Sequence, residues 1–210
     1  MKMNGKKVIE VINKIYEVLD KNKAYLTELD ATIGDGDHGL NMSRGFSAVV
    51  EKLKDESGDN IGDVFKKTGM ALVSNVGGAS GPLYGTAFMK GAMAVNGKSD
   101  MGIQDFLNVL RSALDGVKQR GKGTEGEKTM IDALSPAVKA IEESINNGDD
   151  VVTVLKKAKD AALQGVEFTK TIVATKGRAS YLGERSIGHQ DAGATSCFYI
   201  LETIYEEVKA

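Results

Sequence analysis

The feature that most constrains this chain is a helical period that recurs along almost its whole length. Apolar residues return every three or four positions in successive stretches, and short breaks rich in Gly, Asp, Asn and Ser separate these stretches. Only two prolines, Pro82 and Pro136, occur in the 210 residues. Because proline removes a backbone donor and breaks helices, its near absence together with this spacing predicts an all-α protein.

Eight helices are predicted, joined by short connections. They cover approximately residues 1–20, 38–53, 60–76, 80–95, 103–119, 129–146, 151–172 and 191–210. Short connections place consecutive helices antiparallel. We therefore expect an eight-helix antiparallel up-and-down barrel or bundle that forms one domain over residues 1–210.

Four connections are richer in glycine and unusual polar residues than the others. They cover residues 30–38, 77–81, 121–128 and 177–193. These connections precede the second, fourth, sixth and eighth predicted helices, so in an antiparallel bundle all four fall at the same end. The sequence therefore predicts a functional site at one end of the bundle.

Composition excludes several classes of partner. The formal net charge is -2, so no overall field attracts nucleic acid or an anionic membrane. No window approaches the roughly 18 consecutive apolar residues of a membrane-spanning helix, and the first twenty residues are amphipathic rather than a leader. The single cysteine, Cys197, lies in an apolar run and is expected to be buried. We expect a cytoplasmic protein with no nucleic-acid or membrane partner.

The first of the four connections gathers three carboxylates, at Asp30, Asp35 and Asp37. Like charges repel unless a cation holds them or they point apart into water. Carboxylates with no cysteine or second histidine nearby suit Mg²⁺, and the interleaved glycines allow a tight turn. Because Mg²⁺ held by a few carboxylates usually takes further ligands from substrate phosphates, a phosphate-bearing ligand is expected. The alternative is a solvated acidic loop in which Asp37 caps the next helix.

Two other connections suit a phosphate. In "NVGGASGPLYG", Gly78, Ala79 and Ser80 precede a helix, so free amides, a hydroxyl and the positive end of the helix dipole would meet an anion. The alternative is a glycine-rich turn with Ser80 as a helix cap. In the longest connection, 177–193, the guanidinium of Arg178 could bind a phosphate through two hydrogen bonds.

Three familiar motifs are only superficially present. "GDGDHG" matches G-x-G-x-x-G, but no strand precedes it and its two aspartates would repel a pyrophosphate. The same stretch lacks the glycine and the glutamate of a calcium-binding EF-hand loop. "GKGTEGEKT" resembles a P-loop with Glu127 inserted before Lys128, but again no predicted strand precedes it. We reject all three.

At these residues the chain resembles the nucleotide-binding L subunits of bacterial dihydroxyacetone kinases. "IGDGDHGLNMSRGF", "VGGASGPLYGT", "RGK" with "EKTM", and "KGRASYLGERSIGHQDAGATS" each resemble a segment of that family, in the same order. The resemblance covers essentially the whole chain. It implies an eight-helix barrel that binds a nucleotide and two Mg²⁺ ions at one end, with Asp30, Asp35 and Asp37 as the metal ligands.

The resemblance also implies nucleotide contacts in or beside the four connections. Leu83 and Met130 would pack on the adenine, and Arg178 would be the one catalytic residue, neutralising charge on the transferred phosphoryl group. The full set of predicted nucleotide contacts is His38, Gly39, Leu40, Asn41, Gly78, Ala79, Ser80, Leu83, Gly121, Thr129, Met130, Arg178, Asp191 and Gly193.

The function implied is that of a phosphoryl-transfer subunit. Bound ADP or ATP with Mg²⁺ would act as a coenzyme, recharged by a phosphohistidine on an M subunit of the phosphotransferase system. Its γ-phosphate would pass to dihydroxyacetone held on a K subunit. The chain contains no nucleophile or base triad, and it starts at its first helix and stops after its last, so it is expected to need a partner.

Two alternatives stay open. One is the nucleotide-binding subunit of an ATP-dependent kinase for another keto-sugar. The other is an ADP-binding co-regulator of a transcription factor, which loss of an aspartate or of Arg178 would favour; all four residues are present.

Overall fold

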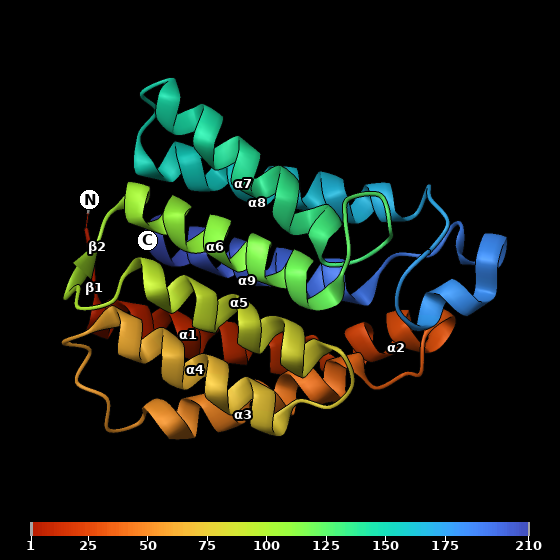
Figure 1. Cartoon of the computed structure of the whole chain (residues 1–210), viewed down its shortest axis with the longest axis horizontal. Coiled ribbons are helices and arrows are strands. Elements are labelled where there is room, and N and C mark those ends of the chain that lie inside the picture. Colours follow the sequence, from red (N-terminus) through yellow and green to blue (C-terminus); the bar gives the residue numbers. More distant parts are fainter. Residues whose placement is uncertain (1, 210) are drawn as a thin grey trace. The chain divides into compact units, whose positions relative to one another are not determined.

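The computed structural model describes residues 2–209 (Figure 1). Within this part of the chain there are nine α-helices, one 3-10 helix and one pair of two-residue strands. In chain order they are β1 (Met3–Asn4), α1 (Gly5–Lys21), α2 (Lys23–Ile33), α3 (His38–Leu53), α4 (Ile61–Asn75), α5 (Ser80–Ala94), β2 (Asp100–Met101), α6 (Ile103–Gly121), α7 (Ile131–Asn146), α8 (Val151–Thr169), η1 (Arg178–Ser186) and α9 (Ala192–Lys209). The all-α fold class predicted from the sequence is confirmed.

The structure adds two helical segments to the eight predicted helices. Helix α2 follows α1 after one residue, and within it only Leu26 and Ile33 are buried. Two buried positions seven residues apart form a narrow apolar face, so the helical repeat of apolar residues is not visible in this part of the sequence. The second addition, η1, lies inside the connection 177–193, which the sequence pattern presents as irregular.

The chain divides into two compact units. Unit 1 contains the chain up to Glu17 together with Asn41–Lys122, and unit 2 contains Val18–Leu40 together with the chain from Gly123 onward. Helices α1 and α3 each contribute residues to both units. The expectation of a single domain over 1–210 stays a prediction.

Unit 1 is built on the packing of α5 against α4 and α6. The ring of Phe88 on α5 packs edge-on against Phe46 and Phe65, with centroid separations of 6.2 and 5.9 Å. Helices α4 and α5 approach closely at two glycines, since a Cβ on Gly85 would lie 2.8 Å from the carbonyl oxygen of Gly69. Small residues at this crossing allow the two helices to pack backbone to backbone.

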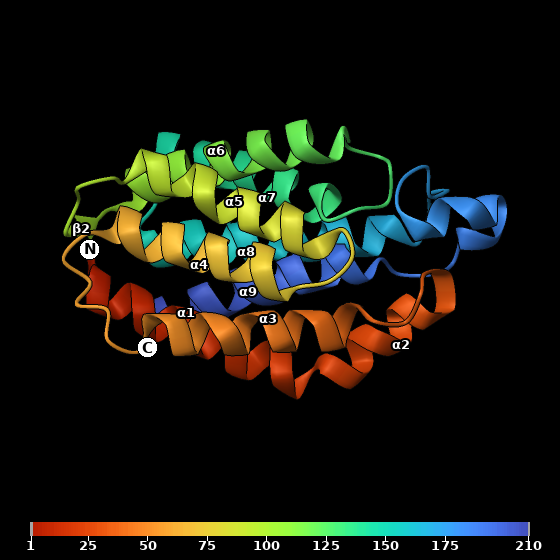
Figure 2. The ribbon, with the colours of Figure 1, turned by 60° about the horizontal axis from the view of Figure 1, so that its bottom comes forward.

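Unit 2 is built on α7, α8 and α9, which lie side by side (Figure 2), with α2 against α9 and η1 against α2. A Cβ on Gly165 of α8 would lie 2.0 Å from the carbonyl oxygen of Asp132, so α7 and α8 approach as closely as backbones can. Cys197 of α9 is buried as expected, and burial raises the pKa of its thiol to about 12.

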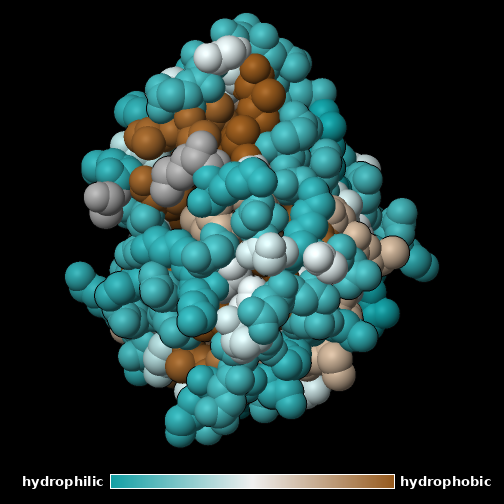
Figure 3. All heavy atoms as spheres, turned by 90° about the vertical axis from the view of Figure 1, so that its left-hand side faces the viewer, coloured by the Kyte–Doolittle hydropathy of each residue, from teal (hydrophilic) through white to brown (hydrophobic). Residues whose placement is uncertain are grey.

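One face of the surface is drawn in Figure 3. Hydrophilic residues cover most of the face in Figure 3, and the hydrophobic atoms on it gather in smaller groups. Across residues 2–209, none of the helices combines the length and the apolar character needed to cross a membrane.

Candidate metal and nucleotide site

Three carboxylates of unit 2 converge at the turn between α2 and α3. One oxygen each from Asp30, Asp35 and Asp37 lies within 4.8 Å of the other two. Glycines make this turn possible. A Cβ on Gly34 would lie 2.1 Å from Asp30 Oδ1, and Gly36 has a φ of +72°, a left-handed conformation that favours glycine.

Asp30 connects this turn to the start of α3. Its Oδ2 accepts hydrogen bonds from the backbone N–H groups of Asp37 (2.9 Å) and His38 (3.1 Å). The first amides of a helix lack partners within the helix and carry its positive end. Asp30 therefore accepts from the first amide of α3 and from the amide that precedes it.

Arg178 lies at the acidic cluster. Its Nε is 3.1 Å from Asp35 Oδ2, and the two side chains are 68% and 44% exposed. Ile33 packs with Ala174 and with Ala179 of η1, and this contact holds the segment that carries Arg178 against α2. An exposed ion pair contributes at most about 1 kcal/mol, so exchange of the Asp35 carboxylate for another anion costs Arg178 little.

His38 and Gly39 hold the start of α3 in place within unit 2. The imidazole of His38 is 7% exposed, and its Nε2 lies 2.8 Å from the Ser196 hydroxyl of α9. Burial lowers the pKa of His38 below its usual value, which favours the neutral ring. A Cβ on Gly39 would lie 2.0 Å from the Lys23 carbonyl oxygen and 2.6 Å from Thr27 Oγ1, so only glycine lets α2 and α3 meet here.

Asp132 holds the segment that precedes α7 through hydrogen bonds. Its two carboxylate oxygens accept hydrogen bonds from the N–H groups of Gly126 (2.5 Å) and Thr129 (2.8 Å). Met130 follows and is buried. A Cβ on Gly193 would lie 3.7 Å from the Met130 Cβ, so the predicted contacts Met130 and Gly193 are neighbours.

Asp191 caps α9. Its Oδ2 accepts from the Ala194 N–H at 2.6 Å, and its own N–H donates to Thr169 Oγ1 at 3.1 Å. Burial is the largest influence on this carboxyl and raises its pKa to about 7, although the hydrogen bond from Ala194 acts in the opposite direction.

A family profile described as the DAK2 domain matches residues 32–206, which is more than half of the chain. The chain belongs to the DAK2 domain family.

Two full-length relatives place the chain more closely within the DAK2 family. It is 43% identical over 204 residues to the "PEP-dependent dihydroxyacetone kinase, ADP-binding subunit DhaL" of Escherichia coli (strain K12), an alignment that covers 97% of each chain. It is 48% identical over 185 residues to the "PEP-dependent dihydroxyacetone kinase 1, ADP-binding subunit DhaL" of Listeria innocua, covering 88% of this chain and 87% of the relative. Within the DAK2 family it therefore groups with kinase subunits.

A solved structure supports the fold of this DAK2 domain. The native crystal structure of the dihydroxyacetone kinase of C. freundii aligns with a TM-score of 0.73 and 26% sequence identity. The alignment covers 95% of this chain but 34% of that one, so the chain spans about a third of the length of that kinase.

In this DAK2 chain the predicted site residues divide between the two units. Unit 2 contains the first connection, 30–38, the last, 177–193, and the part of the third, 121–128, that begins at Gly123. The Arg178–Asp35 ion pair joins the first to the last, and Met130, two residues after the third, lies beside Gly193. The predicted residues in unit 2 are Asp30, Asp35, Asp37, His38, Gly39, Leu40, Thr129, Met130, Arg178, Asp191 and Gly193. Those in unit 1 are Asn41, Gly78, Ala79, Ser80, Leu83 and Gly121.

Within unit 1 the predicted residues form two small groups. Leu83 and Gly121 are neighbours, since a Cβ on Gly121 would lie 3.2 Å from Leu83 Cδ2. In the glycine loop, Gly78 has a φ of +62°, and Ala79 rather than Ser80 occupies the position before the first turn of α5.

Arg44 is a residue of unit 1 that the sequence analysis missed. Its Nη2 donates to Asn41 Oδ1 at 2.7 Å and its Nε to the Asn75 carbonyl oxygen at 3.0 Å, beside Gly77, where a Cβ would lie 3.2 Å from Asn41 Oδ1. Arg44 therefore places a positive charge next to the glycine loop. The sequence could have indicated Arg44, because a basic residue three positions after Asn41 lies on the same face of a helix.

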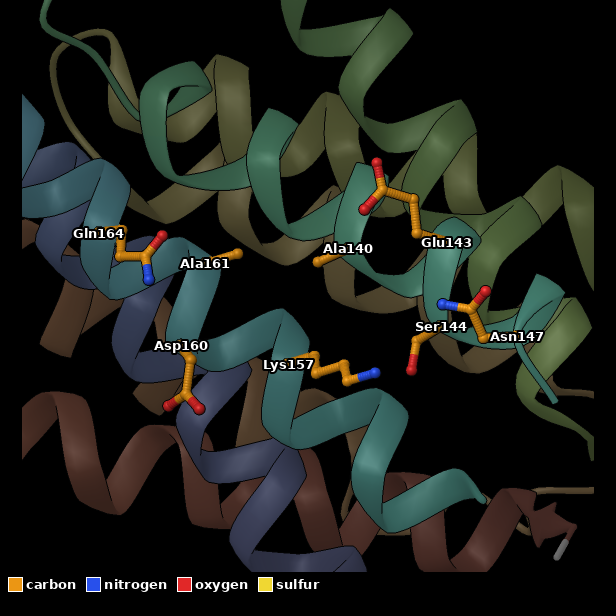
Figure 4. Close-up of a pocket in the computed structure, with 8 residues that line it drawn as sticks. All are labelled: Ala140, Glu143, Ser144, Asn147, Lys157, Asp160, Ala161 and Gln164. Atoms are coloured by element: carbon orange, nitrogen blue, oxygen red, sulfur yellow. The ribbon is translucent and has the colours of Figure 1, made fainter. Parts of the chain in front are cut away.

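A separate pocket of about 360 Å³ lies between α7 and α8 (Figure 4). Its lining is about equally polar and apolar and includes Ser144, Asn147 and Lys157. Asn147 is 16 residues along α7 from Ile131, which is about 24 Å at 1.5 Å per residue. No predicted site residue lines this pocket, which lies at the opposite end of α7 from Met130.

The pKa of Asp191 predicts a pH dependence of stability. A folded pKa near 7, above the value near 3.8 of an unfolded aspartate, means that the folded protein keeps a proton that the unfolded chain has lost. This contribution therefore falls as pH rises through 5 to 7. We expect the free energy of unfolding of the wild type, relative to that of Asp191→Asn, to drop by about 1–3 kcal/mol between pH 5 and pH 8, as measured by urea titrations. This range is smaller than the free energy that corresponds to the whole pKa difference, because the residue is partly exposed.

Asp160→Asn is the matched control, because hydrogen bonds from Lys156 and Lys159 lower the pKa of Asp160 and move its titration below this pH range. A difference between wild type and Asp191→Asn that stays flat from pH 5 to pH 8 would contradict the assigned burial of this carboxyl.

Proposed function

We propose that this DAK2 domain is the phosphoryl-transfer subunit of a dihydroxyacetone kinase, with bound ADP or ATP and Mg²⁺ as its coenzyme. The observation that supports this most is the cluster of three carboxylates at the start of α3. It occurs in a chain whose full-length relatives are named ADP-binding subunits.

The residues of the cluster fit Mg²⁺ in number and chemistry. Carboxylate oxygens are the ligands that this ion prefers, and the cluster contains no cysteine that would favour a softer metal. Hydrogen bonds and the Arg178 ion pair engage Oδ2 of Asp30 and of Asp35. We assign Asp30, Asp35 and Asp37 as the residues that would hold the metal, and we propose two ions. Bound Mg²⁺ would neutralise negative charge on the phosphates.

The chain itself would contribute positioning and charge. Phosphoryl transfer passes through a loose transition state, so it needs alignment and electrostatic stabilisation more than a protein nucleophile. Asp30 fixes the first amides of α3 next to the cluster. Arg178, already at the cluster through Asp35, is the residue that we assign to the transferred phosphoryl group, as the catalytic side chain.

The other predicted residues would hold the nucleotide. In unit 2, buried Met130 beside Gly193 offers an apolar surface that suits adenine. In unit 1, Leu83 beside Gly121 offers another, and the loop from Gly78 to Ser80 offers backbone amides. The remaining contacts are proposed from the family resemblance: His38, Gly39, Leu40, Asn41, Thr129 and Asp191.

The proposed partners follow from the same family. The subunit would be recharged by the phosphohistidine of a phosphotransferase-system M subunit and would deliver the γ-phosphate to dihydroxyacetone on a K subunit. The relatives' names contain "PEP-dependent", which supports this route over direct use of free ATP. We place the protein in the cytoplasm, where phosphoenolpyruvate is made, without a nucleic-acid or membrane partner.

The metal assignment predicts the effect of Asp37→Asn. The variant keeps the size of the side chain but removes one ligand charge, so Mg·ADP should bind at least tenfold more weakly by calorimetry, a loss of about 1.4 kcal/mol. Glu28→Gln, which removes an exposed charge from α2 outside the cluster, should leave the affinity unchanged. Equal affinities in wild type and Asp37→Asn, with both folded, would contradict the ligand assignment.

The coenzyme role predicts where the transferred phosphate comes from. Nucleotide released by denaturing the purified protein should be ADP or ATP. When the protein is mixed with its K subunit, label from phosphoenolpyruvate should reach dihydroxyacetone through the phosphotransferase components, whereas free ATP alone should not support turnover. Turnover driven by free ATP alone would overturn the coenzyme role, and release of no nucleotide would count against the site as a whole.

A further inference from the structure

A buried lysine lies next to the predicted nucleotide contacts of unit 2. Lys128 is 1% exposed, and its φ of 62° lies in the left-handed region that side chains rarely adopt. Lysine is almost never fully buried unless its ammonium is paired. Its position immediately before Thr129 and Met130 gives this burial a consequence for the site.

The ammonium of Lys128 is bound at the end of α8. It donates to the carbonyl oxygen of Thr169, the last residue of that helix, and to that of Ile172 at 3.3 Å. The last carbonyls of a helix have no partner within it and carry its negative end, so a cation is favourable there. Enclosed and bonded in this way, Lys128 is not placed to bind a phosphate as a P-loop lysine does.

Thr169 connects this lysine to a second predicted segment. Its side chain is fully buried, and while its carbonyl accepts from Lys128, its hydroxyl accepts from the backbone N–H of Asp191 at 3.1 Å. The end of α8 thus holds the segment 128–130 with one bond and the start of α9 with another. These are the segments whose Met130 and Gly193 lie side by side.

Burial lowers the pKa of Lys128, and two acidic residues nearby act in the opposite direction. Asp132 and Asp191 both act on its ammonium electrostatically and offset part of the cost of burying it. Asp132 in turn holds the Thr129 N–H, so the same carboxylate contacts the backbone that the lysine orients. Removing the ammonium would leave the carbonyl oxygens of Thr169 and Ile172 without this donor.

We propose that Lys128 is a positioning residue for the nucleotide: its buried ammonium holds the Thr129–Met130 segment against the end of α8, at a fixed place beside Asp191 and Gly193. This inference rests on the proposed function, because it assumes that these segments contact the base and sugar. The proposal assigns a role to the lysine of "GKGTEGEKT", the stretch that resembles a P-loop.

The test replaces Lys128 with methionine, which keeps the length of the side chain and removes its charge. With the full chain and calorimetry, Lys128→Met should bind Mg·ADP at least tenfold more weakly. Mg·pyrophosphate should bind within twofold of wild type, because the acidic cluster and Arg178 lie on other segments. Lys157→Met, which removes an exposed lysine of α8 that pairs with Asp149, should change neither affinity.

Unchanged Mg·ADP affinity in Lys128→Met would overturn the inference, as would equal losses for Mg·ADP and Mg·pyrophosphate, which indicate a general structural role. Lys128→Gln keeps the inference testable if Lys128→Met does not fold, because it retains a polar donor but removes the charge of the ammonium. It should weaken Mg·ADP at least threefold with Mg·pyrophosphate unchanged, whereas unchanged Mg·ADP affinity would overturn the inference. Failure of the wild type to bind Mg·ADP would instead overturn the proposed function.

Discussion

The repulsion among three carboxylates within 4.8 Å of one another is the constraint that organises unit 2. A tight turn through Gly34 and Gly36 is needed to bring them together, and α3 must begin at His38 for its first amides to face Asp30. The positive end of α3 and the guanidinium of Arg178 each offset part of the negative charge. Both compensating groups are also suited to a bound phosphate, so the features that stabilise the cluster are those that its proposed function requires.

A second set of charges lies deeper in the same unit and is arranged differently. The acidic cluster is partly exposed and its ion pair is exchangeable, whereas Lys128 is enclosed and bonded to fixed backbone carbonyls. Exposed pairs contribute little to stability, but breaking a buried one leaves an uncompensated charge. We infer that the exposed charges serve the ligand directly, while the buried ones fix the segments around it.

Local patterns in the sequence were enough to predict much of this arrangement. The period and the breaks predicted the α3 helix from His38 to Leu53, and the spacing of the aspartates predicted their convergence. Helix α2 was missed because only Leu26 and Ile33 are buried in it. The pairing of Asp35 with Arg178, 143 positions away, could not be predicted, because it depends on how η1 packs on α2. Burial of Lys128 could not be predicted for the same reason, since its partners Thr169 and Ile172 lie at and after the end of α8, far along the chain.

The central claim is that Asp30, Asp35 and Asp37 hold a divalent ion that also contacts the nucleotide phosphates. Replacing Mg²⁺ with Mn²⁺ in the presence of ADP and recording pulsed electron paramagnetic resonance tests it directly. The account predicts hyperfine coupling between the bound Mn²⁺ and phosphorus, and loss of the bound ion when the three aspartates are changed to asparagine. Bound ADP without Mn²⁺–phosphorus coupling, or equal Mn²⁺ binding by the triple variant, would contradict it.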